Sequence, residues 1–291
     1  MAAREFASGN LLAESGAGIN VSRPVQSIAA QLKLALSAGI YLVTTLIGVL
    51  IFLYPFLTGA TPQTSQLVSS PIVLGIAISL CLAALAVESQ GQALSAKIVA
   101  LLGVLIALNS VLRMAETALP TPGGFTPVFL LIILSGYVFG ARFGFLMGAL
   151  SLLVSALFTA GVGPWLPHQM FTAGWMGMSA GWLNRLWSQL SPTRRGELAA
   201  LIAFGVVWGF LYGAIMNLWF WPFQAGSPDQ SYQAGLSAGD TLQRYAVFYV
   251  ATSLAWDVFA AAGNAVLLGV FGAATLKALR RFRNRFLFEI D

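Results

Sequence analysis

Long, nearly uninterrupted apolar segments are the feature that most constrains this chain. Eight of them follow one another, most of them close in length to the roughly 20 apolar residues that cross a bilayer as a helix. They cover 34–57, 70–87, 97–116, 126–140, 143–161, 170–188, 198–222 and 245–276. Only 9% of the 291 residues are charged, whereas soluble domains carry about 25%. The sequence therefore predicts an all-α polytopic membrane protein with about eight transmembrane helices, and it excludes a water-soluble enzyme.

The distribution of Lys and Arg predicts the orientation. With the N-terminus inside, thirteen of the fifteen cations fall in inner segments, and only Arg113 and Arg244 fall outside. Cytoplasmic loops of membrane proteins are enriched in Lys and Arg, so both termini are predicted to be cytoplasmic. Residues 1–33 are then a cytoplasmic leader, and the basic tail 277–291 is expected to lie against anionic headgroups.

Several function classes find no support in the residues. Cys81 is the only cysteine and His168 the only histidine, so neither a metal site nor a bound cofactor is expected. No Gly-x-x-x-x-Gly-Lys-[Ser/Thr] phosphate loop is present, so the chain has no ATPase of its own. A single histidine also makes a Ser/His/Asp constellation untenable, and no catalytic residue is predicted. The formal charge of +5 is attributed to loop bias rather than to nucleic-acid binding.

Small residues recur at the spacing that lets membrane helices approach closely. Three ladders of glycines four residues apart are predicted to pack inside the bundle: Gly140, Gly144 and Gly148; Gly177 and Gly181; and Gly205, Gly209 and Gly213. A fourth stripe, which consists of Ala96, Ala100, Gly103 and Ala107, lies on one face of the third segment. This smooth stripe suits the docking of another helix, and spacing leaves open whether that helix is internal or belongs to another subunit.

Polar residues inside apolar segments are costly and often functional. Asn109, Arg113 and Glu116 share one face of the third segment. Asp257 is placed about 12 residues into the last segment, roughly 18 Å deep at 1.5 Å per residue. A carboxylate at that depth must be protonated, paired or in contact with water, so Asp257 is a candidate ligand contact. Arg113 is either such a contact or an interfacial cation paired locally with Glu116.

Outer loops at 117–125, 162–169 and 223–244 are the expected lid and walls of a small-molecule site. The second loop contains Trp165 and His168 between and after two prolines, Pro164 and Pro167, which fix the backbone and present the side chains. Aromatic residues are frequent on this side of the bundle, and an interfacial belt is the alternative explanation for them.

Two segments resemble a known family. The segment Gly136-Tyr137-Val138-Phe139-Gly140-Ala141-Arg142-Phe143-Gly144-Phe145-Leu146-Met147-Gly148-Ala149 is followed by Gly161-Val162-Gly163-Pro164-Trp165-Leu166-Pro167-His168-Gln169-Met170. Together they resemble the substrate-binding S component of energy-coupling factor (ECF) vitamin transporters, and the cobalamin type is the most similar. The resemblance covers residues 95–276 as a six-helix core, and it leaves two additional helices in 34–94.

The resemblance implies a multi-pass subunit of a prokaryotic cell membrane that is not an enzyme. Such a subunit binds a vitamin from outside, and it topples within the membrane when it docks to a scaffold subunit driven by two ATPases. Docking is implied for the stripe on the third segment, where Ala96-Lys97-Ile98-Val99-Ala100 matches an Ala-x-x-x-Ala element. The implied vitamin contacts are Arg113, Phe125, Trp165, His168, Gln169, Trp175 and Asn217.

Two other functions remain open at this point. A structural or assembly membrane protein would use the glycine ladders and the basic tail to hold other subunits. An intramembrane enzyme would use Asp257 or His168 as acid or base, although the two residues are predicted at different depths.

Overall fold

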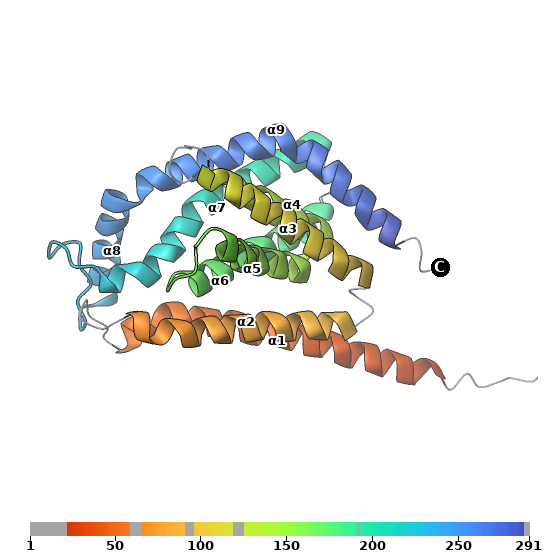
Figure 1. Cartoon of the computed structure of the whole chain (residues 1–291), viewed down its shortest axis with the longest axis horizontal. Helices are drawn as coiled ribbons and strands as arrows, with labels where there is room; N and C mark the ends of the chain where they lie inside the picture. Colours follow the sequence, from red (N-terminus) through yellow and green to blue (C-terminus); the bar gives the residue numbers. More distant parts are fainter. Residues whose placement is uncertain (1–21, 59–65, 91–95, 119–124, 191–192, 288–291) are drawn as a thin grey trace, which may run out of the picture.

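The computed structural model describes residues 22–58, 66–90, 96–118, 125–190 and 193–287, and within these residues the chain is helical with no strand (Figure 1). The helices are α1 (Ser22–Thr58), α2 (Gln66–Gln90), α3 (Ala96–Ala118), α4 (Val128–Phe139), α5 (Ala141–Phe158), α6 (Leu166–Ser188), α7 (Arg194–Phe220), the 3-10 helix η1 (Trp221–Phe223), α8 (Ala238–Thr252) and α9 (Leu254–Leu287). The start of α1 and the end of α9 lie at the same end of the molecule, and α8 lies at the other, which we call the α8 end (Figure 1).

Several helices have the length and composition of membrane spans. Five described segments are long and apolar enough to cross a bilayer: Ala35–Leu57, Ala96–Ala118, Ala141–Phe158, Arg194–Phe223 and Leu254–Arg285. Pro71–Val87 and Val128–Phe139 are shorter apolar helices. The prediction of an all-α polytopic membrane protein is therefore confirmed.

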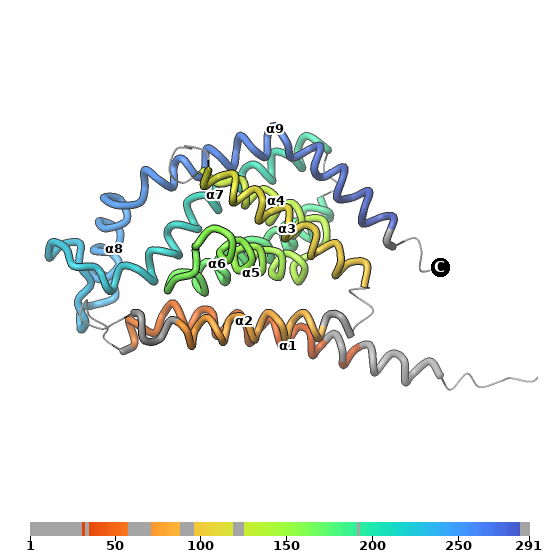
Figure 2. The backbone as a smooth tube through the Cα atoms, in the orientation of Figure 1, coloured from red at the N-terminus to blue at the C-terminus, as the bar shows by residue number. Residues whose placement is uncertain are grey.

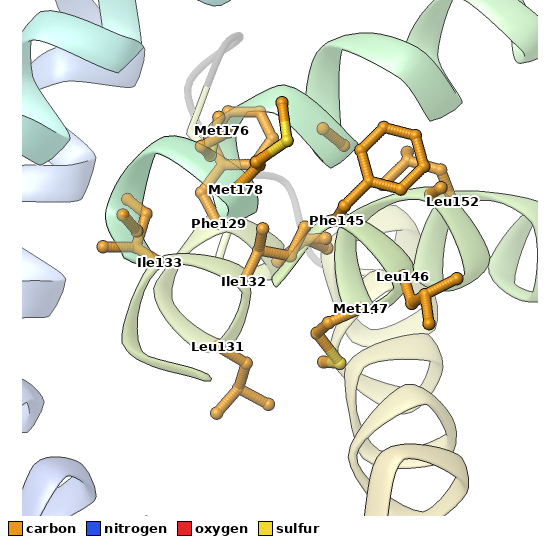
Figure 3. Packing of buried hydrophobic residues seen from close by; sticks show 14 of the residues in the cluster. Phe129, Leu131, Ile132, Ile133, Phe145, Leu146, Met147, Leu152, Met176 and Met178 are labelled. Atoms are coloured by element: carbon orange, nitrogen blue, oxygen red, sulfur yellow. The ribbon is translucent and has the colours of Figure 1, made fainter. Parts of the chain in front are cut away.

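Helices α4, α5 and α6 form the centre of the bundle and approach one another through glycines. A Cβ atom placed on Gly144 would lie 2.1 Å from the carbonyl oxygen of Gly177, and one placed on Gly148 would lie 2.1 Å from that of Ala173. No larger side chain fits at these positions, so the predicted internal role is confirmed for Gly144 and Gly148, whereas a Cβ atom placed on Gly140 would meet no atom within 4 Å. Large side chains fill the surrounding space, among them Ile132 of α4 in the cluster shown in Figure 3.

Helices α7 and α9 form a second close pair. A Cβ atom placed on Gly209 would lie 2.4 Å from the Cα atom of Ala261, and the Nδ2 atom of Asn264 donates to the Gly205 carbonyl at 2.8 Å. The hydrogen bond joins the two helices, which is the role expected for a buried asparagine between membrane helices. The third glycine ladder therefore also packs internally.

The two N-terminal helices lie side by side along one flank of the bundle and run in opposite directions (Figures 1 and 2). They pack on α5, α6 and α7. A Cβ atom placed on Gly48 of α1 would lie 2.7 Å from ring atoms of both Phe171 and Trp175 of α6. At the α8 end, the Tyr232 hydroxyl donates to the Phe56 carbonyl at 3.4 Å. Contacts at both places attach α1 to the rest of the molecule.

The prediction of one continuous last span over 245–276 is wrong. The chain breaks at Ser253, where φ is −125° and ψ −29°, so α8 ends at Thr252 and α9 starts at Leu254. Asp257 consequently lies in the first turn of α9 rather than 12 residues into a span. The predicted depth of its carboxylate is therefore wrong as well.

Candidate functional site

The last turns of α7, from Tyr212 to Trp219, are the place where α4, α6, α8 and α9 meet. The ring of Tyr212 lies 4.7 Å from that of Phe129 of α4, and the Tyr245 hydroxyl of α8 donates to the Ala214 carbonyl. Thr172 of α6 directs its hydroxyl to the Met216 sulfur at 3.7 Å. Three of the predicted ligand contacts, His168, Asn217 and Asp257, lie on or directly against these turns, so we take this α8-end region as the candidate site.

His168 lies in an aromatic cage between three helices. Its ring centroid is 4.9 Å from that of Phe52 of α1, with the planes at 83°, and 4.9 Å from that of Trp219 of α7. The imidazole is only 3% exposed, and its Nδ1 atom faces the Pro164 carbonyl oxygen at 3.2 Å. Its Nε2 atom is buried and makes no hydrogen bond of acceptable geometry with the described residues.

The prediction that His168 and Gln169 lie in a loop is wrong. Helix α6 starts at Leu166, so both residues lie in its first turn, and Gln169 donates its backbone N–H to the Trp165 carbonyl at 2.9 Å. Pro167 lies in that turn too, where its missing N–H costs nothing because the first amides of a helix have no partner inside it. Pro164 and Pro167 therefore lie just before and within the first turn of α6, rather than in a longer loop.

Trp175 lies two helical turns beyond His168 and is half-buried against α1. Its ring centroid is 5.7 Å from that of Phe52 and 6.0 Å from that of Phe171. The indole Nε1 atom is buried, and no described residue accepts a hydrogen bond from it. Phe52 thus contacts two of the three predicted ligand contacts of α6, His168 and Trp175.

Asp257 lies on the other side of α7. The Tyr249 hydroxyl of α8 donates to its Oδ2 atom at 2.7 Å. A Cβ atom placed on Gly213 would lie 2.0 Å from its Oδ1 atom and 2.2 Å from its Oδ2 atom, so the carboxyl group occupies the space that a larger α7 side chain would fill. Burial, and next the hydrogen bond to Asp257, raise the pKa of the Tyr249 phenol, which keeps it a donor. The carboxyl group is only 7% exposed and has a partner that the sequence did not indicate.

Arg113 lies half-buried on the face of α3 that looks toward α4. It interacts electrostatically with Glu116 and with Tyr212. The Thr126 hydroxyl, which precedes α4, donates to the Glu116 Oε2 atom at 2.6 Å. Local pairing of Arg113 with Glu116 was one of the two expected interpretations, and this arrangement agrees with it.

The remaining predicted contacts differ in their surroundings. Trp165 is 40% exposed, its ring lies against Gly163, and its Nε1 atom donates to the Gly161 carbonyl at 3.0 Å. Phe125 lies against α9, where a Cβ atom placed on Gly263 would be 2.5 Å from its ring. Asn217 of α7 is half-buried, and its Nδ2 atom is buried with no partner among the described residues.

Five of the eight predicted contacts fall into three groups, which are named here by their helices. His168, Gln169 and Trp175 belong to the α6 group, Arg113 to the α3 group and Asp257 to the α8–α9 group. Sequence reasoning missed Phe52 and Tyr249, which complete the first and third groups. The aromatic-rich end of the first segment, Phe52-Leu53-Tyr54-Pro55-Phe56, is the signal that could have indicated Phe52.

This region combines aromatic rings with buried polar nitrogen atoms. Aromatic faces supply contact area, and buried nitrogen atoms of Trp175 and Asn217 have no hydrogen-bond partner among the described residues. No group of three His, Cys, Asp or Glu side chains within the described residues is arranged to hold a metal ion.

The stripe of small residues on α3 lies on the surface. Ala96, Ala100, Gly103 and Ala107 are all exposed, and a Cβ atom placed on Gly103 would meet no atom within 4 Å. The two N-terminal helices pack on α5, α6 and α7 and leave this stripe open. A separate partner can therefore reach it.

Comparison with known families identifies the matched region. The family model for the substrate-specific component of ECF transporters matches residues 97–271, from the second residue of α3 into α9. No curated protein and no solved structure matches the chain significantly. Helices α1 and α2 lie outside the match, which still covers more than half of the chain. The chain therefore belongs to the family of substrate-specific components of ECF transporters.

Proposed function

We propose that this protein is the specificity subunit of an ATP-driven importer and that it binds a vitamin or related micronutrient, with cobalamin as the first candidate. Its family is a transport family rather than an enzyme family, and its members associate with an ECF scaffold and ATPase modules. The observation that carries the proposal is the convergence of aromatic rings and unpartnered buried nitrogen atoms around the last turns of α7. This combination favours binding of a large, mostly uncharged ligand.

The ligand would enter at the α8 end, which we propose to be the exterior. Trp165 is 40% exposed and Gln169 is half-buried, so both are accessible next to the caged His168. A corrinoid presents a broad apolar face and a rim of amide groups. Such a ligand could stack on the indole of Trp165 and exchange hydrogen bonds with Gln169 and Asn217.

Delivery of the ligand to the scaffold would depend on the N-terminal half of α3, which precedes Arg113. The exposed stripe Ala96, Ala100, Gly103 and Ala107 lets a helix of the scaffold subunit approach closely, because no long side chain separates the backbones. Arg194, Arg195 and the cations of α9 lie at the end where α1 starts and α9 ends, which supports a cytoplasmic location for that end.

The decisive experiment is ligand binding by the purified chain without ATP. Calorimetry with a corrinoid should give saturable binding, and a thermal-shift screen of flavins, pyrimidines and deazapurines should identify the ligand if the corrinoid does not bind. If every one of these compounds leaves the protein unchanged, the binding role is contradicted.

Affinity purification tests the alternative of an assembly protein. Co-purified ATPase subunits support the importer. A complex that contains no ATPase supports an assembly role, because the same exposed stripe and glycine contacts would then hold other subunits.

A further inference from the structure

A cleft at the end opposite α8 lies outside both the candidate ligand site and the small-residue stripe on α3. It has a volume of about 1320 Å³ and lies between the first turns of α7 and the last turns of α9. Figure 1 shows these two helix ends on the side of the molecule away from α8. This region is far along both helices from the candidate ligand site near Trp219.

The lining of the cleft is strongly cationic. Five Lys and Arg side chains and a single carboxylate, that of Glu197, line it, so the lining carries a formal charge of +4. The start of α7 contributes its own partial positive charge, because the first backbone N–H groups of a helix point outward along its axis. Both features attract an anion.

The single carboxylate of the cleft is already neutralised. Arg280 of α9 donates through its Nη1 atom to the Glu197 Oε2 atom at 3.0 Å and through its Nη2 atom to Oε1. The Tyr137 hydroxyl of α4 donates to the same carboxylate at 2.7 Å. Glu197 is therefore engaged by Arg280 and Tyr137, while Lys277, Arg281 and Arg285 of the lining face no other acidic residue in the cleft.

The position of the cleft along α9 matches the boundary between the hydrocarbon core and the headgroups of a bilayer. Helix α9 starts at Leu254, and Lys277 lies about 35 Å further along its axis at 1.5 Å per residue. The hydrocarbon core of a bilayer is about 30 Å thick. Lys277 and the arginines after it therefore reach headgroup level, whereas Ala273 and Leu198 on the same cleft wall lie closer to the acyl chains.

We propose that this cleft binds an anionic phospholipid of the inner leaflet. Its phosphate lies among Lys277, Arg281 and Arg285, and the upper part of an acyl chain lies along Leu198 and Ala273. The combination of a cationic floor and an apolar wall distinguishes a lipid from a free phosphate ion, which needs no apolar contact. A bound lipid would bridge α7 and α9 at the end where the Glu197–Arg280 pair already joins them.

The test uses the full-length protein in neutral detergent, with phosphatidylglycerol, phosphatidylcholine and inorganic phosphate as probes. Lys277 and Arg281 are exposed, and their replacement as K277Q/R281Q leaves the Glu197–Arg280 pair intact. The matched control, R185Q/R195Q, removes the same charge from exposed residues of the same end that do not line the cleft. Native mass spectrometry measures retained lipid, and titration in mixed micelles measures affinity.

The wild type should retain phosphatidylglycerol in preference to phosphatidylcholine. K277Q/R281Q should weaken its affinity for phosphatidylglycerol about tenfold or more, in line with the contribution of cationic side chains at an anionic surface. The control should change affinity less than threefold. Equal losses in the two variants would overturn the proposal, because general surface charge would then explain the binding.

Two further measurements use the wild type. Millimolar inorganic phosphate should not displace the lipid; full displacement would assign the cleft to a free anion and overturn the lipid proposal. A photoactivatable phosphatidylglycerol should crosslink to the region 273–285, and crosslinking confined to other helices would also overturn it. Vitamin binding is expected to be the same in K277Q/R281Q as in the wild type, so this proposal and the proposed function can fail independently.

Discussion

Phe52 of α1 meets His168 of α6 edge to face, with ring centroids 4.9 Å apart and planes at 83°. His168 belongs to the region that the family model matches, whereas Phe52 belongs to a helix outside it. The N-terminal helices are therefore part of the candidate site, because one of their side chains closes the cage around its only histidine.

Replacement of Phe52 by alanine should remove one wall of that cage. Truncation of a buried phenylalanine leaves a cavity and costs about 3 kcal/mol, so the thermal midpoint in detergent should fall clearly. Leu53→Ala is the matched control, since Leu53 is 41% exposed on the same helix. Equal midpoints for the two variants would contradict the packing of α1 on α6.

Gly213→Ala should displace the Asp257 carboxyl group from the Tyr249 hydroxyl, because the added methyl group would lie about 2 Å from the carboxyl oxygens. Overpacking of this kind costs about 1–3 kcal/mol. Gly103→Ala provides the comparison, because its methyl group would meet no atom within 4 Å and alanine is the better helix former. The two variants should differ in thermal midpoint, and a Gly213→Ala variant as stable as wild type would refute this close approach.

The Glu197–Arg280 pair should show measurable coupling in a double-mutant cycle of Glu197→Gln and Arg280→Met. The pair is bidentate but partly exposed, so we expect a coupling energy of about 1 kcal/mol that decreases with added salt. Denaturant unfolding in mixed micelles gives the four free energies. A coupling energy of zero at low salt would show that the pair does not hold α7 against α9.

Ala100→Trp should abolish uptake and leave ligand binding intact, because the indole would block the stripe on α3 without reaching the α8 end. Val207→Trp adds the same bulk to an exposed residue of α7 and should transport normally. Uptake of radiolabelled ligand by cells with the complete transporter is the measurement. Normal uptake by the Ala100→Trp variant would remove the stripe from the docking surface.

Trp165→Ala should weaken ligand binding by about 1 kcal/mol or more, which corresponds to a fivefold or larger rise in Kd, as expected when an aromatic anchor is lost. Trp182→Ala removes an indole of similar exposure further along α6 and should leave the Kd unchanged. Calorimetry compares the two. An unchanged Kd for Trp165→Ala would exclude this indole from the site.

Much of the architecture could be read from residue pattern alone. The apolar segments predicted the helices, and the glycine spacing predicted close packing that Gly144 and Gly209 confirm at atomic distance. These features are local or periodic, so they are visible along the chain. The partners of each face are not periodic, and for that reason the covering of Trp175 by Phe52 could not be predicted.

Two boundaries were missed for identifiable reasons. The break at Ser253 falls in the sequence Val250-Ala251-Thr252-Ser253-Leu254, which contains neither glycine nor proline, so no residue there marks a helix end. The start of α6 could not be located from Pro164 and Pro167, because prolines are common both in turns and in the first turn of a helix. Both errors changed the predicted surroundings of a candidate residue, Asp257 in one case and His168 in the other.

The attachment of α1 has a mechanical consequence for transport. Gly48 and Phe52 hold the C-terminal part of this helix to α6, and the Tyr232 hydroxyl holds its end to the loop before α8. If the bundle tilts in the membrane when it docks to the ATP-driven scaffold, these contacts require α1 and α2 to tilt with it. The tilting unit is then wider than the matched helices alone, because α1 and α2 are attached along one flank. More of the surrounding lipid must therefore rearrange when it tilts.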